Sequence, residues 1–287
     1  MSFIIFAWIA AVGYGLTTVI GKLASKHAIK NPWLLNYLLT LFVLLFTIPI
    51  ASLNNISIPS DWNNIFLASC CYSLYFIFIT LSYYKLDVSV LSPLYNFRAA
   101  FSVLLGFFVL GELLKPIQVL IVGLIIAAGF FVSIDEKFNL SSFFQRGVAL
   151  ALTAMVFLSL TGMFVNKAIA QVGYWNTTFW MYVLIQILLA LTIPFFIKDL
   201  PKINYKQLGV TAAAALSFVA GDLSANRAYS ENLGVSSVII SLPISMLLAF
   251  LFSVFAPKLL EKHTLKVYAI RFAAASIMII SALKLSM

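Results

Sequence analysis

The chain has 287 residues, of which 63% are hydrophobic and only 9% are charged, with a formal net charge of +9. A soluble domain carries about a quarter charged residues, so this composition excludes a water-soluble fold of this size. The lysines lie between apolar blocks, not in basic runs interleaved with aromatic residues, so they indicate the loops of a membrane protein and no nucleic-acid partner.

Ten apolar segments follow one another along the chain, and most have the length of about 18–25 residues that crosses a bilayer core of about 30 Å as a helix. Membrane-spanning strands would alternate in polarity, and these segments do not. The first segment lacks a basic start and a small-residue cleavage site, so we expect a retained helix and not a signal peptide. The expected helices span 2–24, 34–53, 63–84, 88–110, 115–134, 146–168, 175–197, 207–230, 234–256 and 264–284.

A tripeptide occurs twice in the chain, as Thr47-Ile48-Pro49 and again 145 residues later as Thr192-Ile193-Pro194. Two further pairs match at the same offset, namely Lys22 with Lys167 and Tyr84 with Tyr229. The sequence therefore predicts two tandem repeats of five helices, at 1–138 and 139–287, in one compact bundle. Because five is odd, the second repeat enters the membrane from the opposite face, which predicts an all-α membrane protein with an inverted-topology repeat.

The distribution of cationic residues predicts the orientation. The odd-numbered connections and the helix ends beside them carry Lys22, Lys26, Lys30, Lys85, Lys137, Arg146, Lys198, Lys202, Lys206, Lys258, Lys262 and Lys266. The opposite face carries Lys115, Lys167, Arg227 and Lys284. Cytoplasmic loops are enriched in Lys and Arg, so this bias places the odd-numbered connections in the cytoplasm and both termini on the other side.

The late part of each half carries a recurring pattern. The first half has VSVLSPLYNFRAAFSVLLGFFVLGE from Val88 to Glu112, followed by a helix with Gly123 and Gly129. The second half runs from Gly234 to Leu260-Glu261, with leucine where the first half has glycine and no glycine in its last helix. This pattern resembles the EamA-like branch of the drug/metabolite transporter superfamily.

That resemblance implies a central cavity lined by helices 1–4 and 6–9, with helices 5 and 10 at the periphery. It also implies export of small organic solutes such as amino acids, and it places both termini in the cytoplasm, against the charge count.

Arg98 is the most informative single residue, because it lies ten residues into the helix predicted at 88–110, near the middle of the bilayer. A central arginine costs about 2.5–3.5 kcal/mol on insertion scales, so a carboxylate, a water-filled cavity or an anionic substrate must offset it. We expect Arg98 to bind a carboxylate or phosphate, the alternative being an arginine tied to backbone carbonyls. Tyr95 and Asn96 precede it, and Pro93 predicts a break in the helix that exposes backbone groups to the solute.

Asp222 is the expected partner of Arg98, because the two residues differ in depth by about 7 Å at 1.5 Å per residue. It is a candidate for proton coupling or for binding a substrate amine, and a static ion pair is the alternative. Asn226 lies one turn further on the same helix face. Pro243 is expected to break the matching helix of the second half. Other polar groups at mid-helix that could line the cavity are Tyr14, Thr17, Tyr75 and Gln186, although packing between helices is an alternative for each.

Several other residues suggest structural roles. Lys22 and Lys167 lie near helix ends, where we expect them to reach the membrane surface. His27 and His263 stand alone among lysines, and Cys70 and Cys71 are adjacent in an apolar block, so we expect neither a disulfide nor a metal site.

The sequence contains no phosphate loop, nucleophile–histidine pair or metal motif, so we expect neither an enzyme nor a cofactor. The leading hypothesis is a multi-pass secondary transporter of the prokaryotic plasma membrane that exports a small polar metabolite by alternating access. The expected partners are a small-molecule substrate, the lipid bilayer and a coupled proton, with the chain a monomer or weak homo-oligomer. The alternatives are an exchanger of sugars or phosphorylated metabolites with the same fold, or a non-transporting scaffold or scramblase.

Overall fold

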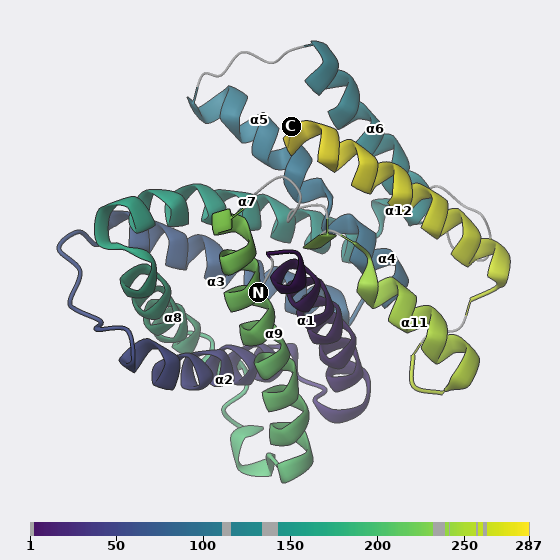
Figure 1. Cartoon of the computed structure of the whole chain (residues 1–287). Coiled ribbons are helices and arrows are strands. Elements are labelled where there is room, and N and C mark those ends of the chain that lie inside the picture. The colour runs from purple at the N-terminus through teal and green to yellow at the C-terminus, as the bar shows by residue number, and fades with distance from the viewer. Residues whose placement is uncertain are drawn as a thin grey trace.

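The chain folds into long helices, with no strand in any segment that the structure describes (Figure 1). The structure is a computed structural model, and it describes residues 3–110, 116–133, 143–231, 239–240, 242–256, 258–260 and 263–286. The first half contains α1 (Phe3–Leu23) with the π-helical turn η1 (Ala24–Ala28), α2 (Pro32–Ser52), α3 (Asn63–Tyr83), α4 (Val88–Leu94), α5 (Phe97–Leu110) and α6 (Pro116–Val132). The second half contains α7 (Arg146–Val172), α8 (Tyr174–Ala190), η3 (Ile193–Phe195), η4 (Leu200–Lys202), α9 (Tyr205–Glu231), α11 (Ile244–Phe255) and α12 (Leu265–Ser286).

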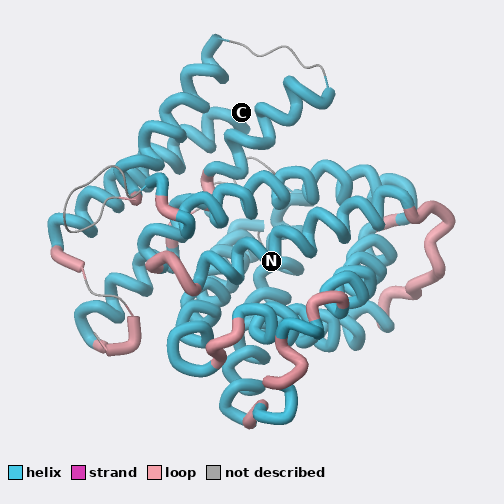
Figure 2. The backbone as a smooth tube through the Cα atoms, turned by 180° about the vertical axis from the view of Figure 1, so that it is seen from behind, coloured by secondary structure: helices cyan, strands magenta, loops and turns pink. Residues whose placement is uncertain are grey.

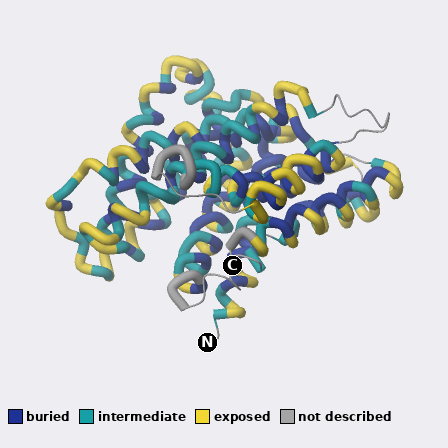
Figure 3. The backbone as a smooth tube through the Cα atoms, turned by 90° about the horizontal axis from the view of Figure 1, so that it is seen from above, coloured by how far each residue is buried: buried dark blue, intermediate teal, exposed yellow. Residues whose placement is uncertain are grey.

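The helices have the length and polarity of membrane spans. Seven helical stretches of the described chain are long and apolar enough to cross a bilayer, and α6 and α11 are shorter apolar helices. Large apolar side chains face outward along one stripe of α1, which carries Ile5, Trp8, Ile9, Val12 and Leu16. Figure 3 shows the same alternation of exposed and buried positions along many helices. An outward apolar face requires lipid as its solvent, so the chain is an integral, multi-pass membrane protein.

Three of the predicted helices differ from the structure. The segment at 88–110 consists of two helices, α4 and α5, separated at Tyr95 and Asn96. In the segment at 234–256, the described residues are helical at 239–240 and from Ile244 to Phe255, with an interruption at Leu242 and Pro243. The segment at 175–197 ends at Ala190 and continues as 3-10 turns through Pro194. The same tripeptide remains helical at Pro49, so the two halves differ at this point.

Helices from opposite halves pack against each other throughout the bundle. The most extensive contacts join α1 with α9, α3 with α7, and α6 with α12, while α2 contacts both α8 and α9. Figures 1 and 2 show α5, α6 and α12 together at one end of the bundle. The backbones of α1 and α9 approach each other closely, since a Cβ atom on Gly13 would lie 2.8 Å from the Cα of Gly221. Glycine at both positions lets these two helices meet beside Tyr14 and Asp222.

Candidate substrate cavity

A cavity of about 1120 Å³ lies between the helices. It is slightly larger than the usual small-molecule site of about 300–1,000 Å³. Its lining residues at one end, Asn166 and Arg227, are exposed, whereas Thr18 and Tyr83 at the other end are buried. The cavity therefore opens at the face where α7 ends and α8 begins, and it closes at the face where α3 ends.

The cavity walls come from both halves of the chain. Described residues of α1–α5, α7–α9 and α11 line the cavity, as the family resemblance implied, and none of α6 does. The last turns of α12 add Ala282 and Leu283, so this helix is not wholly peripheral.

The break between α4 and α5 lies in the cavity wall. The amide of Asn96 donates to the carbonyl of Pro93 at 3.0 Å and that of Arg98 to the carbonyl of Tyr95 at 3.1 Å. These three-residue bonds replace helical four-residue bonds at the break. The side chain of Asn96 also donates to the carbonyl of Pro93, while its buried Oδ1 has no described partner. Pro93 itself lies inside α4, two residues before the break, and the break leaves an acceptor without a described partner beside the cavity.

Arg98 lies in the first turn of α5 and lines the cavity with an exposed side chain. Its backbone is fixed by Ser159, whose hydroxyl donates to the Arg98 carbonyl at 3.0 Å. Gly162 provides room for the guanidinium, since a Cβ there would lie 3.3 Å from Nη2. No hydrogen bond or ion pair joins the guanidinium to another described residue. Arg98 thus lies in the cavity wall, with its positive charge towards the cavity.

Asp222 lies on the wall formed by α9, where three side chains donate hydrogen bonds to it. The hydroxyl of Tyr14 donates to Oδ1 at 3.2 Å, and that of Tyr182 donates to Oδ2 at 3.4 Å. The amide of Asn226 donates to Oδ2 at 3.4 Å and also to the hydroxyl of Tyr174 at 2.8 Å. These donors hold an acidic group in place at the cavity surface.

The direct ion pair expected between Arg98 and Asp222 is not present. Both residues line the same cavity and each lies within the electrostatic field of the other, but neither bonds to the other. The expectation was wrong because Tyr14, Tyr182 and Asn226 already supply donors to the carboxylate. The cavity thus presents a cation and an anion separately.

Most of the remaining predicted residues line the cavity as well. Tyr95, Thr17 and Tyr75 do so, together with Asn96, Tyr14 and Asn226 described above. Gln186 does not: it is buried between α2 and α8, where Thr40 donates to its Oε1 at 3.0 Å. Gln186 is therefore a packing residue, the alternative that the sequence left open.

Aromatic rings that the sequence did not single out form much of the cavity wall. Tyr75 and Phe76 follow Tyr72 on α3 by three and four positions, so each shares a helix face with Tyr72, and this spacing was visible in the sequence. Tyr174 and Trp175 line the open end of the cavity from the start of α8. The described part of the wall thus carries nine aromatic residues, six of which are tyrosines.

The second predicted break is also observed, since Pro243 immediately precedes the regular helix α11. Next to it, the hydroxyl of Ser245 donates to that of Ser92 at 2.6 Å, which joins α11 to α4. Glu112 and Glu261, which belong to the family pattern, lie outside the described residues.

Lys22 was expected at the membrane surface and His263 without a polar partner, but both make polar contacts inside the protein. Lys22 is only 7% exposed and bonds to backbone carbonyls, whereas Lys167 is exposed as expected. His263 is not alone but bonds to Asp87 at 2.7 Å. The sequence analysis missed Arg271, which is 2% exposed. The signal that identified Arg98, an arginine within an apolar helix, applied equally to Arg271.

The fold and the cavity define a multi-pass helical membrane protein with a polar chamber between its helices. Residues 1–134 match the EamA-like transporter family. This part of the chain is therefore similar to that family, in agreement with the resemblance found in the sequence. The match supports a membrane transporter of the drug/metabolite type.

Comparison with solved structures shows the same fold. The alignment with one crystal structure of a protein covers 99% of this chain and 95% of the other chain, with a TM-score of 0.64 and 14% sequence identity. At that identity the similarity shows the fold alone. No curated protein sequence matches the chain. Among the described residues, no group of three or more His, Cys, Asp or Glu side chains has the arrangement of a metal site.

Proposed function

We propose that this protein is a secondary transporter that exports a small polar metabolite with an anionic group, an amino acid or a related organic acid. The observation that carries the proposal is the guanidinium of Arg98, which faces a cavity of about 1120 Å³ without a described protein partner. An arginine at mid-membrane needs a compensating group, and a substrate carboxylate supplies one with matching planar geometry.

The acidic wall extends the proposal from anions to zwitterions. Asp222 keeps its carboxylate at the cavity surface, while Tyr14, Tyr174 and Tyr182 surround it. Aromatic faces and a carboxylate together favour an ammonium group. An α-amino acid would place its carboxylate on Arg98 and its ammonium on Asp222, and the aromatic wall would contact its side chain.

Alternating access is supported by the arrangement of helix contacts. In the two predicted repeats, α1, α2 and α3 correspond to α7, α8 and α9, and the α4–α5 segment corresponds to α11. The contact of α1 with α9 therefore corresponds to the contact of α7 with α3. In the same way, the α2–α9 contact becomes α8–α3, and α1–α11 becomes α7–α5. This correspondence is what two repeats, 1–138 and 139–287, related by a two-fold axis in the membrane plane would give. The described structure would then be the state open at one face, and rocking of the repeats would generate the other.

The proposed coupling ion is a proton, carried by Asp222. Protonation removes the negative charge, and the surrounding hydroxyl and amide groups can reorient to a neutral acid. Substrate and proton would then use the same carboxylate in alternation, which links outward substrate movement to inward proton movement. The charge count places the cavity mouth outside a prokaryotic plasma membrane. We propose that the chain works as a monomer or weak homo-oligomer.

Counterflow into proteoliposomes tests the proposal. Purified protein is reconstituted with a panel of unlabelled amino acids, organic acids, sugar phosphates and neutral sugars inside, and uptake of each labelled counterpart is measured. The proposal expects exchange of zwitterionic or carboxylate substrates, with loss in Arg98→Ala and partial recovery in Arg98→Lys. Exchange of sugar phosphates alone would favour the phosphorylated-metabolite alternative. Exchange of carboxylates that Arg98→Ala leaves unchanged would remove this residue from the site.

A further inference from the structure

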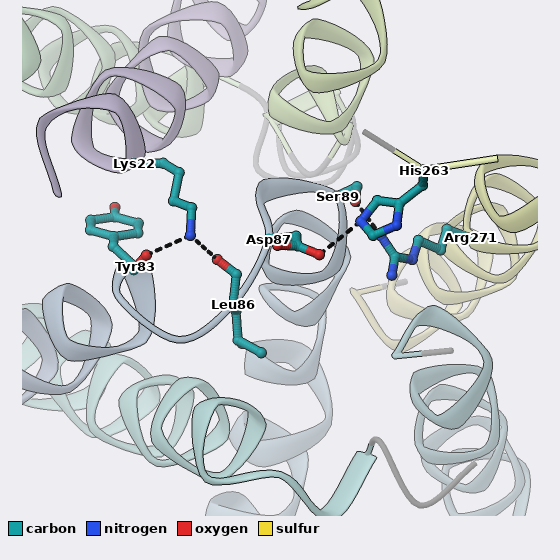
Figure 4. A network of polar contacts seen from close by, with 7 residues as sticks. All are labelled: Lys22, Tyr83, Leu86, Asp87, Ser89, His263 and Arg271. Carbon is teal, nitrogen blue, oxygen red and sulfur yellow. Dashed lines mark hydrogen bonds and ion pairs between the residues drawn. The ribbon is translucent and has the colours of Figure 1, made fainter. Parts of the chain in front are cut away.

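A cluster of charged and polar side chains joins α1, α4 and the α12 region (Figure 4). Three of its residues come from the first half: Lys22 from the last turn of α1, Asp87 from the connection between α3 and α4, and Ser89 from the first turn of α4. The other two are His263, just before α12, and Arg271, within α12. We call these five residues the polar latch. None of them lines the cavity, so the substrate site does not account for them.

Lys22 supports the turn that carries Asp87. Its Nζ donates to the carbonyls of Tyr83 and Leu86 at 2.8 and 2.7 Å. The Tyr83 carbonyl lies at the C-terminal end of α3, where backbone acceptors lack helical partners and the helix dipole favours a cation, and Leu86 lies in the turn that follows. A buried ammonium on two carbonyls thus fixes the connection between α3 and α4 to α1, within the first half of the chain.

The remaining contacts of the polar latch cross between the two halves. His263 Nε2 lies 2.7 Å from Asp87 Oδ2, and Arg271 donates a hydrogen bond to Ser89 Oγ. The burial of Asp87 alone would raise its pKa, but the hydrogen bond and charge of His263 and the charges of Arg271 and Lys22 lower it below the ordinary value. The carboxylate is therefore held in its charged form between cationic groups from α1 and the α12 region.

The position of the polar latch relates it to the cavity. Thr18 and Tyr83 form the closed end of the cavity, and Lys22 lies one helical turn beyond Thr18 on α1. Gly21 fits against the ring of Tyr83, because a Cβ there would lie 3.0 Å from that ring. The latch thus lies between the cavity and the face that the charge count places in the cytoplasm.

We propose that the polar latch is the gate that keeps the cavity closed at this face. Separation of Asp87 from His263, and of Ser89 from Arg271, removes two contacts that join the halves at this face, while Lys22 keeps the turn that carries Asp87 intact. This inference rests on the alternating access of the proposed function. It adds the residues that must separate before the cavity opens to the face opposite its present mouth.

Accessibility of the closed end tests the gate without any substrate. In a background in which Cys70→Ala and Cys71→Ala remove the native thiols, Thr18→Cys places one thiol at the closed end. An impermeant maleimide is then added to oriented vesicles from either face, and its labelling rate is measured. We expect His263→Ala, and separately Asp87→Asn, to raise labelling from the latch face at least about tenfold, the factor that about 1.4 kcal/mol corresponds to.

Two further variants make the result specific. Exchange of the pair, Asp87→His with His263→Asp, should restore slow labelling, which a merely misfolded single variant would not explain. Asp61→Asn is the matched control, because Asp61 accepts a hydrogen bond from Gln171 across the two halves at the opposite face. It should leave labelling from the latch face unchanged.

Unchanged labelling in both His263→Ala and Asp87→Asn, or a raised rate that the exchanged pair does not lower, would overturn the gate. Labelling of Thr18→Cys needs no substrate. If labelling changed in the latch variants as expected but the protein transported no substrate, the proposed function would be contradicted and the gate would not.

Discussion

Replacement of Gly13 by alanine should separate α1 from α9 and loosen the residues around Asp222. A Cβ at this position would lie 2.8 Å from both the Cα of Gly221 and the carbonyl oxygen of Ser217, which are backbone atoms that cannot rotate away. Carbon atoms pack best at about 3.5–4.0 Å, so the helices must move apart by about 0.7 Å or more. The hydrogen bond from Tyr14 to Asp222, 3.2 Å long, would then exceed hydrogen-bonding distance.

The energetic cost follows from these two changes. Overpacking costs about 1–3 kcal/mol, and loss of a hydrogen bond to a charged group costs about 1.5–3 kcal/mol where it is complete. In a chain of this size a loss of 1 kcal/mol lowers the melting temperature by about 2–4 °C, so Gly13→Ala should lower it by several degrees.

Thermal melting in a single detergent measures the effect against a matched control. Gly209→Ala lies in α9, where the added Cβ meets no atom within 4 Å, and alanine is the better helix former. We expect Gly209→Ala to melt at or slightly above the wild-type temperature. If Gly13→Ala melted together with Gly209→Ala, the close packing of α1 on α9 would be refuted.

Three further predictions concern single residues. Asp222→Asn should abolish the dependence of transport on a pH gradient; retained dependence in proteoliposomes would place coupling elsewhere. Gln186→Leu should leave the apparent substrate affinity in a counterflow assay unchanged, and a tenfold change would return Gln186 to the cavity. The lowered pKa of Asp87 implies that its interactions stabilise the fold above the ordinary carboxyl pKa and are lost as pH falls through the lowered value. The wild type should therefore melt above Asp87→Asn at neutral pH, with the difference vanishing in acid; a constant difference would contradict this.

The fold could be predicted from the sequence because the membrane restricts the choices. Apolar segments of spanning length must be helical, and this rule placed nearly all helices within a few residues. Pro93 lies two residues before the first interruption, inside α4, and Pro243 immediately precedes α11. Thr192-Ile193-Pro194 was predicted as helix because it lies within an apolar segment of spanning length, but α8 ends at Ala190 and Ile193–Phe195 forms a 3-10 turn.

The cavity residues could be predicted only in part. Helices that are apolar on all sides give no periodic signal for the face that points inward, so Gln186 and Tyr75 looked equivalent. Rotation about the helix axis, which the packing of neighbouring helices decides, put Tyr75 in the cavity and Gln186 outside it. The pair of Asp87 and His263 joins residues 176 positions apart, and no local pattern indicates it. Arg271 is different, since its place in an apolar helix was a usable signal.

An experimental structure with the transported substrate bound tests the central claim most directly. The account predicts that the anionic group of the substrate lies within hydrogen-bonding distance of the Arg98 guanidinium, and that an ammonium group, where the substrate has one, lies beside Asp222. A substrate bound elsewhere, or a guanidinium turned away from the cavity towards lipid, would contradict it.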